Sequence, residues 1–505
     1  MLFRPTLRHT ARTYRWQCTR TNSTFVKPSQ FGQPLHPSHP HLVKDGELTP
    51  GIHADEYESR RRALMEGLPP NSLVICAAAK VKYMSGRTYK FRQGSDFLYL
   101  SGLLEPSAAF LLRSSPSTPR GYTYSIFHHF HTPSQALWDG PRTNDITLHD
   151  LFGADDVCPI DELPRALKKA LRDADYVYVD QPQETRRTRK SGSAWKALLE
   201  HLAPASLADA KADLLSALSD LGARSGKIRP LAPEVGRLRA IKSPAEQKIM
   251  RAAADVSAHA HTKTMRFAQP GMSEHVLAAH FEYLCAREWS QRPAYVPVVA
   301  SGPNALTIHY TANDQLIRED ELVLIDAGCE LDGYASDITR TFPASGRFTP
   351  AQAELYSAVL AAQKRLVSLS NASAGYSLYQ LHTESVHLLA DELRAIGFNL
   401  DRSSVGLMAE LYPHFVGHPV GIDLHESSHF DRDAPLKPGM VITIEPGIYV
   451  PPRPHYPKHF HNIGIRIEDE VLVGETYPTV LSVNAPKEVA DVEGACTGAL
   501  GLEPL

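Results

Sequence analysis

The sequence predicts an α+β protein of two domains: an α/β domain first, then a pseudo-symmetric α+β domain with its site between two halves. Three observations lead to this prediction. The chain has 505 residues, 43% of them hydrophobic, which is enough for two substantial cores. Strand-like and helix-like stretches alternate in the first half. In the second half, a pattern of helix starts recurs about a hundred residues later.

The N-terminal segment, residues 1–45, is predicted to be a mitochondrial presequence followed by a spacer. The first acidic residue is Asp45, and the sequence before it is rich in Ser, Thr and Arg. Four arginines recur at helical spacing with apolar side chains between them: Arg4, Arg8, Arg12 and Arg15. The alternative is an ordinary solvated basic tail. The stretch from Pro28 to Pro40, rich in Pro, His, Gln and Ser, is predicted to be the spacer.

Residues 50–225 are predicted to form the first domain around a mixed sheet. Five apolar runs are predicted as strands: Ser72–Ala77, Phe97–Leu100, Ala109–Leu112, Tyr122–Phe127 and Tyr176–Val179. Helix-like stretches such as Glu162–Asp173 alternate with them, which indicates an α/β domain. Residues 224–238, with Pro230 and Pro233, are predicted to connect this domain to the next.

Residues 236–485 are predicted to form the second domain, built from two helix–helix–sheet units. Ser243-Pro244-Ala245-Glu246 is a capping-box helix start with Pro in the first turn, and Thr349-Pro350-Ala351-Gln352 repeats it. Gly271-Met272-Ser273 and Gly375-Tyr376-Ser377 open the second helix of each unit. Chance recurrence is the alternative, because both signals are common. Residues 486–505 are predicted to be a C-terminal tail.

Composition excludes several classes of function. A net charge of −3 with 22% charged residues gives no nucleic-acid surface, so no nucleic-acid partner is expected. The six cysteines form no C-x-x-C pair, which argues against a disulfide framework and a thiolate zinc site and favours a reducing compartment. No run approaches the roughly 18 apolar residues that span a bilayer.

Two aspartates are expected to meet at the start of a site. The apolar strand Leu322–Asp326 ends in a carboxylate, and Glu330–Gly333 can turn the chain so that Asp337 returns towards Asp326. With a turn centred near residue 331 or 332 the two are cross-strand neighbours, with β-carbons about 5 Å apart. Two carboxylates so close in apolar surroundings resist ionisation unless a cation is bound.

Two glutamates have similar settings. Glu445 follows the apolar run Met440–Ile444, and Glu468 ends Ile463–Glu468, where period-two alternation places Arg466 and Glu468 on one face. Taken singly, each carboxylate could belong to a buried salt bridge or an edge position. Four of them in one domain favour a metal site.

Histidines complete the predicted site. His414, His418 and His425 lie within twelve residues and are interspersed with glycines that permit close backbone approach, and His309 is a fourth candidate. A ligand set of carboxylate oxygens with one imidazole favours Mn²⁺ or a similar hard divalent ion over structural zinc. Four carboxylates suit two ions about 3.5–4 Å apart, which can lower the pKa of a bridging water.

The ordered set Asp326, Asp337, His418, Glu445 and Glu468 resembles the five metal ligands of the pita-bread metallopeptidases, which include aminopeptidase P, prolidase and methionine aminopeptidase. The resemblance covers about residues 53–485. Its most specific strings are IDAGCELDGYASDITRTF, HFVGHPVGIDLHE, TIEPGIYV and GIRIED.

This resemblance implies a role for each residue of the site. Asp326 would hold one metal ion, Asp337 and Glu468 would bridge, and His418 and Glu445 would complete the other site. A metal-bridging hydroxide would attack the peptide, with Glu445 handling the proton. His309, His414 and His425 would line the substrate site and stabilise the tetrahedral intermediate. Tyr449 and Arg466 match pocket residues of the family, whereas Phe415 and Glu426 depart from its usual residues.

The stretch Tyr89–Gly102 resembles the ribonuclease-H-like N-terminal domain of aminopeptidase P, in which the residue matching Asp96 lies near the active site. The alternative for the other residues is a turn followed by a buried strand. With the presequence, the resemblance is to the mitochondrial branch of the family. It implies removal of a single N-terminal residue from peptides, or from imported proteins after presequence cleavage.

Three other functions stay open: an Xaa-Pro-specific aminopeptidase, a prolidase, and an inactive pita-bread binding module. Peptide or protein N-termini are the expected partners. A location in the mitochondrial matrix, peripheral association with the inner membrane, and a homodimer are further expectations from the resemblance.

Overall fold

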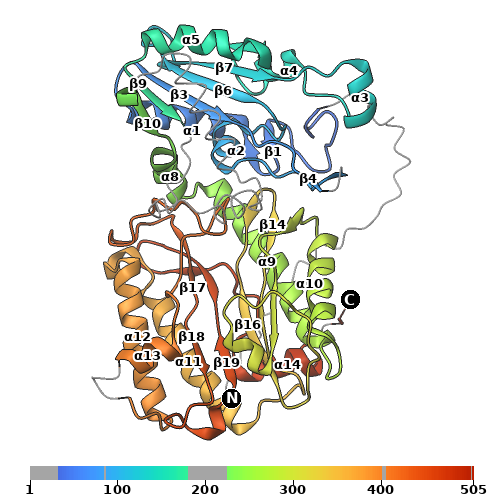
Figure 1. Ribbon diagram of the computed structural model, residues 1–505, viewed down its shortest axis with the longest axis vertical. Helices are drawn as coiled ribbons and strands as arrows, with labels where there is room; N and C mark the ends of the chain where they lie inside the picture. Colours follow the sequence, from blue (N-terminus) through green and yellow to red (C-terminus); the bar gives the residue numbers. More distant parts are fainter. Residues whose placement is uncertain (1–31, 85–86, 180–224, 401–404, 502, 505) are drawn as a thin grey trace, which may run out of the picture.

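The computed structural model describes residues 32–84, 87–179, 225–400, 405–501 and 503–504 (Figure 1). The predicted presequence, residues 1–31 of the N-terminal segment, lies outside them. Among the helices in these ranges, none is long and apolar enough to cross a membrane.

The first domain is built on a six-stranded mixed sheet with the strand order β10-β9-β3-β6-β7-β8. Its strands are β3 (Ser72–Ala77), β6 (Ala109–Ser114), β7 (Tyr122–His128), β8 (Asp156–Pro159), β9 (Tyr176–Val179) and β10 (Ile228–Pro230). Antiparallel pairs join β3 to β6 and β6 to β7, whereas β9 runs parallel to both β3 and β10. The predicted mixed sheet is therefore confirmed.

Helices cover both faces of this sheet. On one face, α5 (Leu163–Asp173) buries Leu167 and Leu171 against side chains of β3 and β9. On the other face lie α1 (Ala54–Gly67) and α2 (Ser95–Ser101), between the sheet and the second domain (Figure 1). The remaining elements of the domain are β1 (Glu47–Thr49), β2 (Ile52–His53), β4 (Tyr83–Met84), β5 (Arg87–Thr88), α3 (Pro133–Asp139) and α4 (Asp145–Asp150).

The prediction of a strand at Phe97–Leu100 was wrong, because these residues lie inside α2. Gly94 precedes the helix, and Gly102 ends it in the left-handed conformation at φ 69°. All residues from Phe97 to Ser101 are buried. A short helix that is buried all round shows an uninterrupted apolar run, which periodicity cannot distinguish from a buried strand.

Part of the predicted spacer packs against the first domain. Val43 is fully buried, and Leu35 is 7% exposed. The side chain of Gln33 donates hydrogen bonds of 2.8 Å to the carbonyl oxygens of Leu48 and Gly102. The residues from Gly32 onwards therefore belong to the folded body.

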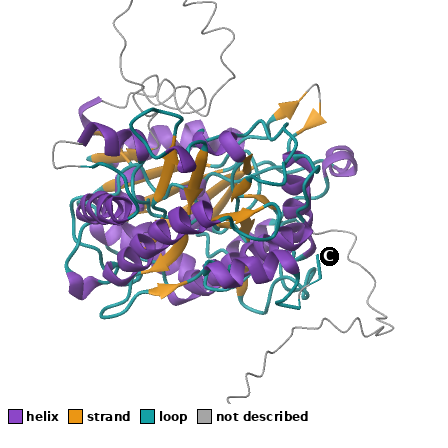
Figure 2. Cartoon of the chain, turned by 90° about the horizontal axis from the view of Figure 1, so that it is seen from below, coloured by secondary structure: helices purple, strands orange, loops and turns teal. Residues whose placement is uncertain are grey.

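The second domain consists of two units that face each other across strands, as Figures 1 and 2 show. The first unit contains α9 (Pro244–Phe267), α10 (Glu274–Arg287), β11 (Arg292–Pro293), β12 (Val298–Ser301), β13 (Leu322–Asp326), β14 (Cys329–Leu331), β15 (Tyr334–Ala335) and β16 (Thr339–Pro343). The second contains α11 (Pro350–Leu369), α12 (Leu378–Ala395), α13 (Val405–Leu411), β17 (Val441–Ile444), β18 (Gly447–Val450), β19 (Ile463–Arg466), β20 (Asp469–Leu472) and β21 (Thr479–Val480). Before them, α8 (Ala232–Ala240) connects the domains.

The repeated helix starts are confirmed in detail. Capping boxes open α9 at Ser243, α11 at Thr349 and α12 at Ser377, and the side chain of Ser273 caps α10. Each side chain satisfies a backbone N–H that the first turn leaves without a partner. The two units are therefore similar because the same kind of helix cap starts both helices of each unit.

The predicted C-terminal tail contains a further helix, α14 (Val489–Thr497). Val492 and Ala495 are buried in the same core as side chains of α9 and β16. This helix therefore contributes to the stability of the second domain.

Candidate metal centre

The five predicted ligands lie on five different segments that meet between the two units. Asp326 ends β13, Asp337 precedes β16, Glu445 follows β17, and Glu468 lies between β19 and β20. His418 is in the loop that runs beside β17, where Pro419 forms a bridge with Ile442. Asp337, His418 and Glu468 each offer a ligand atom, and these three atoms lie within 4.8 Å of one another.

The residue opposite Asp326 differs from the prediction by two positions, because the turn is centred one residue further along the chain. Asp326 lies opposite Thr339, not opposite Asp337. Asp332 and Gly333 form the turn between β14 and β15, with φ values of 51° and 88°. Because both are left-handed, this is a two-residue hairpin turn centred between them, and Asp337 lies diagonally across from Asp326 on the same face.

Tyr295 holds the two aspartates together. Its hydroxyl oxygen lies 2.5 Å from Oδ1 of Asp326 and 2.6 Å from Oδ1 of Asp337. A hydroxyl carries one hydrogen, so it can donate to only one of these carboxylates. The other carboxylate oxygen therefore lies close to the hydroxyl oxygen without its hydrogen, and a bound cation would reduce the repulsion among the three oxygens.

Glu468 and His418 are each fixed by their neighbours. The hydroxyl of Thr339 donates to Oε2 of Glu468 at 2.6 Å. Nε2 of His418 lies 3.2 Å from Oδ2 of Asp337 and 3.7 Å from Oε1 of Glu445. The imidazole therefore faces carboxylates from both units.

The loop that carries His418, here called the histidine loop, lies close against the backbone of β17, as its glycines predict. A β-carbon at Gly417 would lie 1.9 Å from the carbonyl oxygen of Thr443. This contact lets the loop exchange hydrogen bonds with β17: Thr443 N–H donates to His418 O at 2.8 Å, and Glu445 N–H donates to Val416 O at 2.8 Å. His418 and Glu445 are thereby held in one local structure.

The electrostatics of the cluster favour a cation. Burial, with the charges of Asp337, Glu445 and Asp326, raises the pKa of Glu468 well above its ordinary value. Burial raises the pKa of Glu445 to about 7, although His418 and Arg466 act against it. Such groups resist ionisation for lack of positive charge, and a bound divalent cation would supply it.

A hydrogen-bonded chain leads from the cluster to His414. Arg466 is 1% exposed, and its Nη2 donates to Oδ2 of Asp326 at 2.6 Å while its Nη1 donates to the hydroxyl of Tyr449 at 2.7 Å. That hydroxyl lies 2.9 Å from Nε2 of His414. Burial, helped by the charge of Arg466, lowers the pKa of His414 to about 3, so the imidazole is neutral.

The other predicted site residues lie around this core. The ring of His425 packs edge-on against His418 with centroids 4.2 Å apart, and it is exposed. His309 is also exposed, and its charge bears on both His414 and His425. Asp96 makes no described contact with the five ligands, because its Oδ1 is bound by Arg239 at 2.6 Å.

Sequence reasoning missed two residues, Tyr295 and Arg239. Nη2 of Arg239 also bonds Asp423 and Glu426, at 2.7 and 2.8 Å, so this one buried guanidinium ties the first domain to the loop that carries His425. The unusual Glu426, which follows His425, was a signal for such a partner. The residues next to Tyr295 gave no signal of its role, because the two carboxylates that it bonds, Asp326 and Asp337, lie more than 30 residues later in the sequence.

Comparisons with known proteins agree with this geometry. The model of metallopeptidase family M24 matches residues 248–475, and that of the aminopeptidase P N-terminal domain matches residues 57–178. Intermediate cleaving peptidase 55 of Saccharomyces cerevisiae is 38% identical, over 95% of this chain and 91% of that protein. Human Xaa-Pro aminopeptidase 3 is 37% identical, over 94% of this chain and 92% of that protein.

Solved structures give the same result. A crystal structure of the yeast peptidase Icp55 has a TM-score of 0.76 at 36% identity, over 89% of this chain and 99% of that one. Pseudomonas aeruginosa aminopeptidase PepP has a TM-score of 0.76 at 34% identity, with the same coverage of both chains. The predicted pita-bread fold with its N-terminal domain is confirmed, and divalent metal ions follow from the family. The chain therefore belongs to metallopeptidase family M24, as an aminopeptidase with the N-terminal domain of aminopeptidase P.

Proposed function

We propose that the chain removes one N-terminal residue at a time from peptides or from imported mitochondrial proteins after presequence cleavage, using two divalent metal ions. Five side chains would hold the ions: Asp326, Asp337, His418, Glu445 and Glu468. Oxygen donors with one imidazole suit Mn²⁺ best. The observation that carries this proposal is the convergence of four carboxylates and His418 on one buried site.

The residues present fit such a metal pair. The single hydrogen between Asp326 and Asp337 and the raised pKa values of the two glutamates both reflect too little positive charge. His418 shows the same need. Burial alone would lower its pKa, but the hydrogen bond and charge of Asp337, with the charge of Glu445, raise it to about 9. In the absence of a metal ion, the proton on His418 supplies part of the positive charge that Asp337 and Glu445 favour.

The protein groups around the ions have separate tasks. Bound divalent ions supply Lewis acidity and an activated water. Glu445 would hold and release the proton that passes to the departing amine, as the resemblance implies. The one hydrogen of neutral His414 is held by the carbonyl oxygen of Phe415 at 2.9 Å, and its Nε2 accepts from the hydroxyl of Tyr449. Stabilisation of the tetrahedral intermediate by His414, as the resemblance implies, would therefore need an exchange of these partners, while His309 and His425 would bind the substrate from the exposed side.

Asp96 would help to close one end of the substrate site, because Arg239 joins it to the loop that carries His425. This arginine connects α2 of the first domain to Asp423 and Glu426 beside His425. A first domain held against the loop of His425 would suit an enzyme that admits a chain end and removes one residue. We assign Asp96 to the substrate site on this basis.

The mitochondrial role is supported by the basic N-terminal segment and by relatives. The Arabidopsis thaliana relative, 39% identical, is named intermediate cleaving peptidase 55, mitochondrial. Location in the matrix follows from this proposal. Peripheral binding to the inner membrane remains a prediction, and co-sedimentation with cardiolipin vesicles would test it.

Xaa-Pro specificity and prolidase activity are the alternatives within this site. Relatives named Xaa-Pro aminopeptidase 3 are almost as similar to the chain as the intermediate cleaving peptidases. An inactive binding module is disfavoured, because all five predicted ligand residues are present in the sequence and three of them, Asp337, His418 and Glu468, offer atoms within 4.8 Å of one another.

Mass spectrometry of peptide products tests the proposal. The full chain, loaded with Mn²⁺, is incubated with peptides that begin Tyr-Ser, Leu-Ala and Ala-Pro, and with the dipeptide Ala-Pro. Loss of one residue from the first two peptides is expected, and Glu445→Gln should abolish it. Cleavage confined to longer Xaa-Pro peptides would indicate an Xaa-Pro aminopeptidase. Cleavage of the dipeptide alone would indicate a prolidase, and none with any divalent metal would leave a binding module.

We also propose that the protein is a homodimer. On α3, Leu137 and Trp138 are 81% and 83% exposed, and no residue of this helix is buried. Large exposed apolar patches mark interaction surfaces, and this pair of side chains would lie in the contact between the two copies. Light scattering should give twice the chain mass for the wild type and the monomer mass for Leu137→Ser/Trp138→Ser; a monomeric wild type would contradict the proposal.

A further inference from the structure

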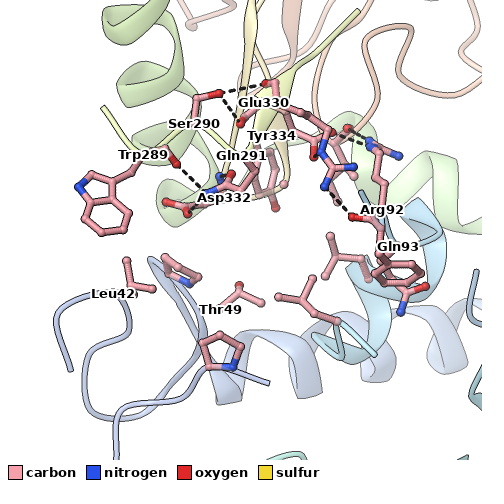
Figure 3. A pocket seen from close by; sticks show the side chains of 18 of the residues that line it. Leu42, Thr49, Arg92, Gln93, Trp289, Ser290, Gln291, Glu330, Asp332 and Tyr334 are labelled. Atoms are coloured by element: carbon pink, nitrogen blue, oxygen red, sulfur yellow. Dashed lines mark hydrogen bonds and ion pairs between the residues drawn. The ribbon is translucent and has the colours of Figure 1, made fainter. Parts of the chain in front are cut away.

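A cavity of about 490 Å³ lies at the junction of the two domains, lined by none of the five predicted metal ligands (Figure 3). One wall comes from the N-terminal segment and first domain, including Leu42, Val43 and Thr49. The opposite wall comes from the end of α10 and the β14–β15 hairpin, including Trp289 and Asp332. The volume falls in the range of small-molecule sites, about 300–1,000 Å³.

Most charged groups on these walls are already neutralised. Arg92 and Arg292 both pair with Glu330, at 2.5 and 3.1 Å. Arg60 pairs with Glu56 at 2.6 Å and also with Glu246. These arginines hold the two domains together and have little charge left for a ligand.

Asp332 and Lys90 are the exceptions, and Lys90 is exposed and donates a hydrogen bond from Nζ to the carbonyl oxygen of Gln291. Among the described residues, no basic side chain lies within ion-pair distance of the carboxylate of Asp332, and its side-chain contact is a long hydrogen bond of 3.4 Å from Nε2 of Gln291. Figure 3 shows the carboxylate pointing into the gap between the two walls. Burial raises the pKa of Asp332 to about 6, as expected for a carboxylate without a counter-charge.

The chemistry of the walls selects the ligand. A metal ion would find only one carboxylate that is not already paired with arginines, and a neutral ligand would leave that carboxylate without a partner. An ammonium group offers three donors to it and is attracted to the face of an aromatic ring such as that of Trp289. Leu42, Val43 and Leu98 would cover an apolar body attached to the ammonium group.

We infer that this cavity is a second binding site, for a small apolar primary amine whose ammonium group pairs with Asp332. The site spans both domains, so a bound amine would contact the N-terminal segment, the first domain and the hairpin together. This inference does not depend on the proposed peptidase chemistry.

Calorimetric titration of the full chain tests this site with phenethylamine and the matched neutral probe phenethyl alcohol. The amine should bind the wild type at least tenfold more tightly than the alcohol. Asp332→Asn should abolish this preference, and asparagine suits the backbone there, because it tolerates the φ of 51°. Leu42→Trp, which fills the cavity, should weaken both probes at least tenfold.

The control variant is Asp337→Asn in the metal centre, which should leave the affinity for the amine unchanged. Equal affinity of the wild type for amine and alcohol would overturn the inference, and so would no binding of the amine. Loss of amine binding in Asp337→Asn with retention in Asp332→Asn would place the amine in the metal centre and would also overturn it. If Asp332→Asn fails to fold, the comparison of the two probes and the Leu42→Trp variant still show whether the amine binds in this cavity.

Discussion

Replacing Gly417 by alanine should separate the histidine loop from β17. The new β-carbon would lie 1.9 Å from the carbonyl oxygen of Thr443 and 2.7 Å from its carbonyl carbon. Both are backbone atoms, so no side chain can rotate away to relieve the overlap. Since such contacts are not found below about 3 Å, loop and strand must move apart by about 1 Å.

The magnitude follows from the contacts that this movement breaks. Three hydrogen bonds join the loop to the strand end, involving Val416, His418, Thr443 and Glu445. At about 1 kcal/mol each, their loss would reduce the free energy of unfolding by about 3 kcal/mol. Because two predicted ligands shift with the loop, kcat/KM should fall by about 100-fold, the usual cost of a 1 Å misplacement.

Urea denaturation and peptide hydrolysis measure these two effects. The matched control is Gly67→Ala at the end of α1, where a β-carbon meets no atom within 4 Å; it should leave both quantities unchanged. If Gly417→Ala retained wild-type stability and activity, the close approach would have no role in positioning His418, and the reasoning would be refuted.

Three further predictions concern stability, pH and metal affinity. Arg340→Ala should reduce the free energy of unfolding by about 3 kcal/mol in urea denaturation, because it removes the 2.8 Å ion pair to buried Asp469, which keeps its partner Lys487, and takes a donor from the carbonyl oxygens of Glu468 and Ala485. The pKa of Asp332 is about 6 in the folded protein, against an ordinary value of 3.8, so ionisation of this carboxyl lowers the stability of the fold as pH rises from about 4 to 6. Asp332→Asn should therefore raise the urea midpoint at pH 7.5 and not at pH 4; an equal change at both would contradict this. Tyr295→Phe should weaken Mn²⁺ binding about tenfold in a competition titration with a chelating dye, because the two aspartates lose their shared donor; unchanged affinity would remove Tyr295 from the centre.

The sequence predicted secondary structure best where neighbouring residues specify it. Capping boxes at Ser243 and Thr349 placed two long helices, and the apolar run before Asp326 placed β13 to the residue. The one-residue error in the position of the turn, which shifted the pairing by two residues, was avoidable. Asp332-Gly333 is a typical two-residue turn pair, and centring the turn between them gives the observed pairing of Asp326 with Thr339.

The rest depended on contacts between distant segments. Tyr295 bonds Asp337, which lies 42 residues away in the sequence, and Arg239 bonds Glu426 at a separation of 187. Nothing in the neighbouring residues specifies such partners. Residues 32–45 were predicted as part of a presequence and spacer because Pro and polar residues dominate there, but Val43 and Leu35 bury their side chains in the first domain. Burial of a few side chains outweighs composition in such a segment.

The measurement that tests the account most directly is native mass spectrometry of the full chain with added Mn²⁺. The five predicted ligands, of which Asp337, His418 and Glu468 offer atoms within 4.8 Å of one another, predict two bound ions per chain for the wild type. Fewer are expected for Glu468→Gln, which removes a charge that both ions would share. A wild type that binds one ion or none, or a Glu468→Gln variant that still binds two with unchanged affinity, would contradict the two-metal site.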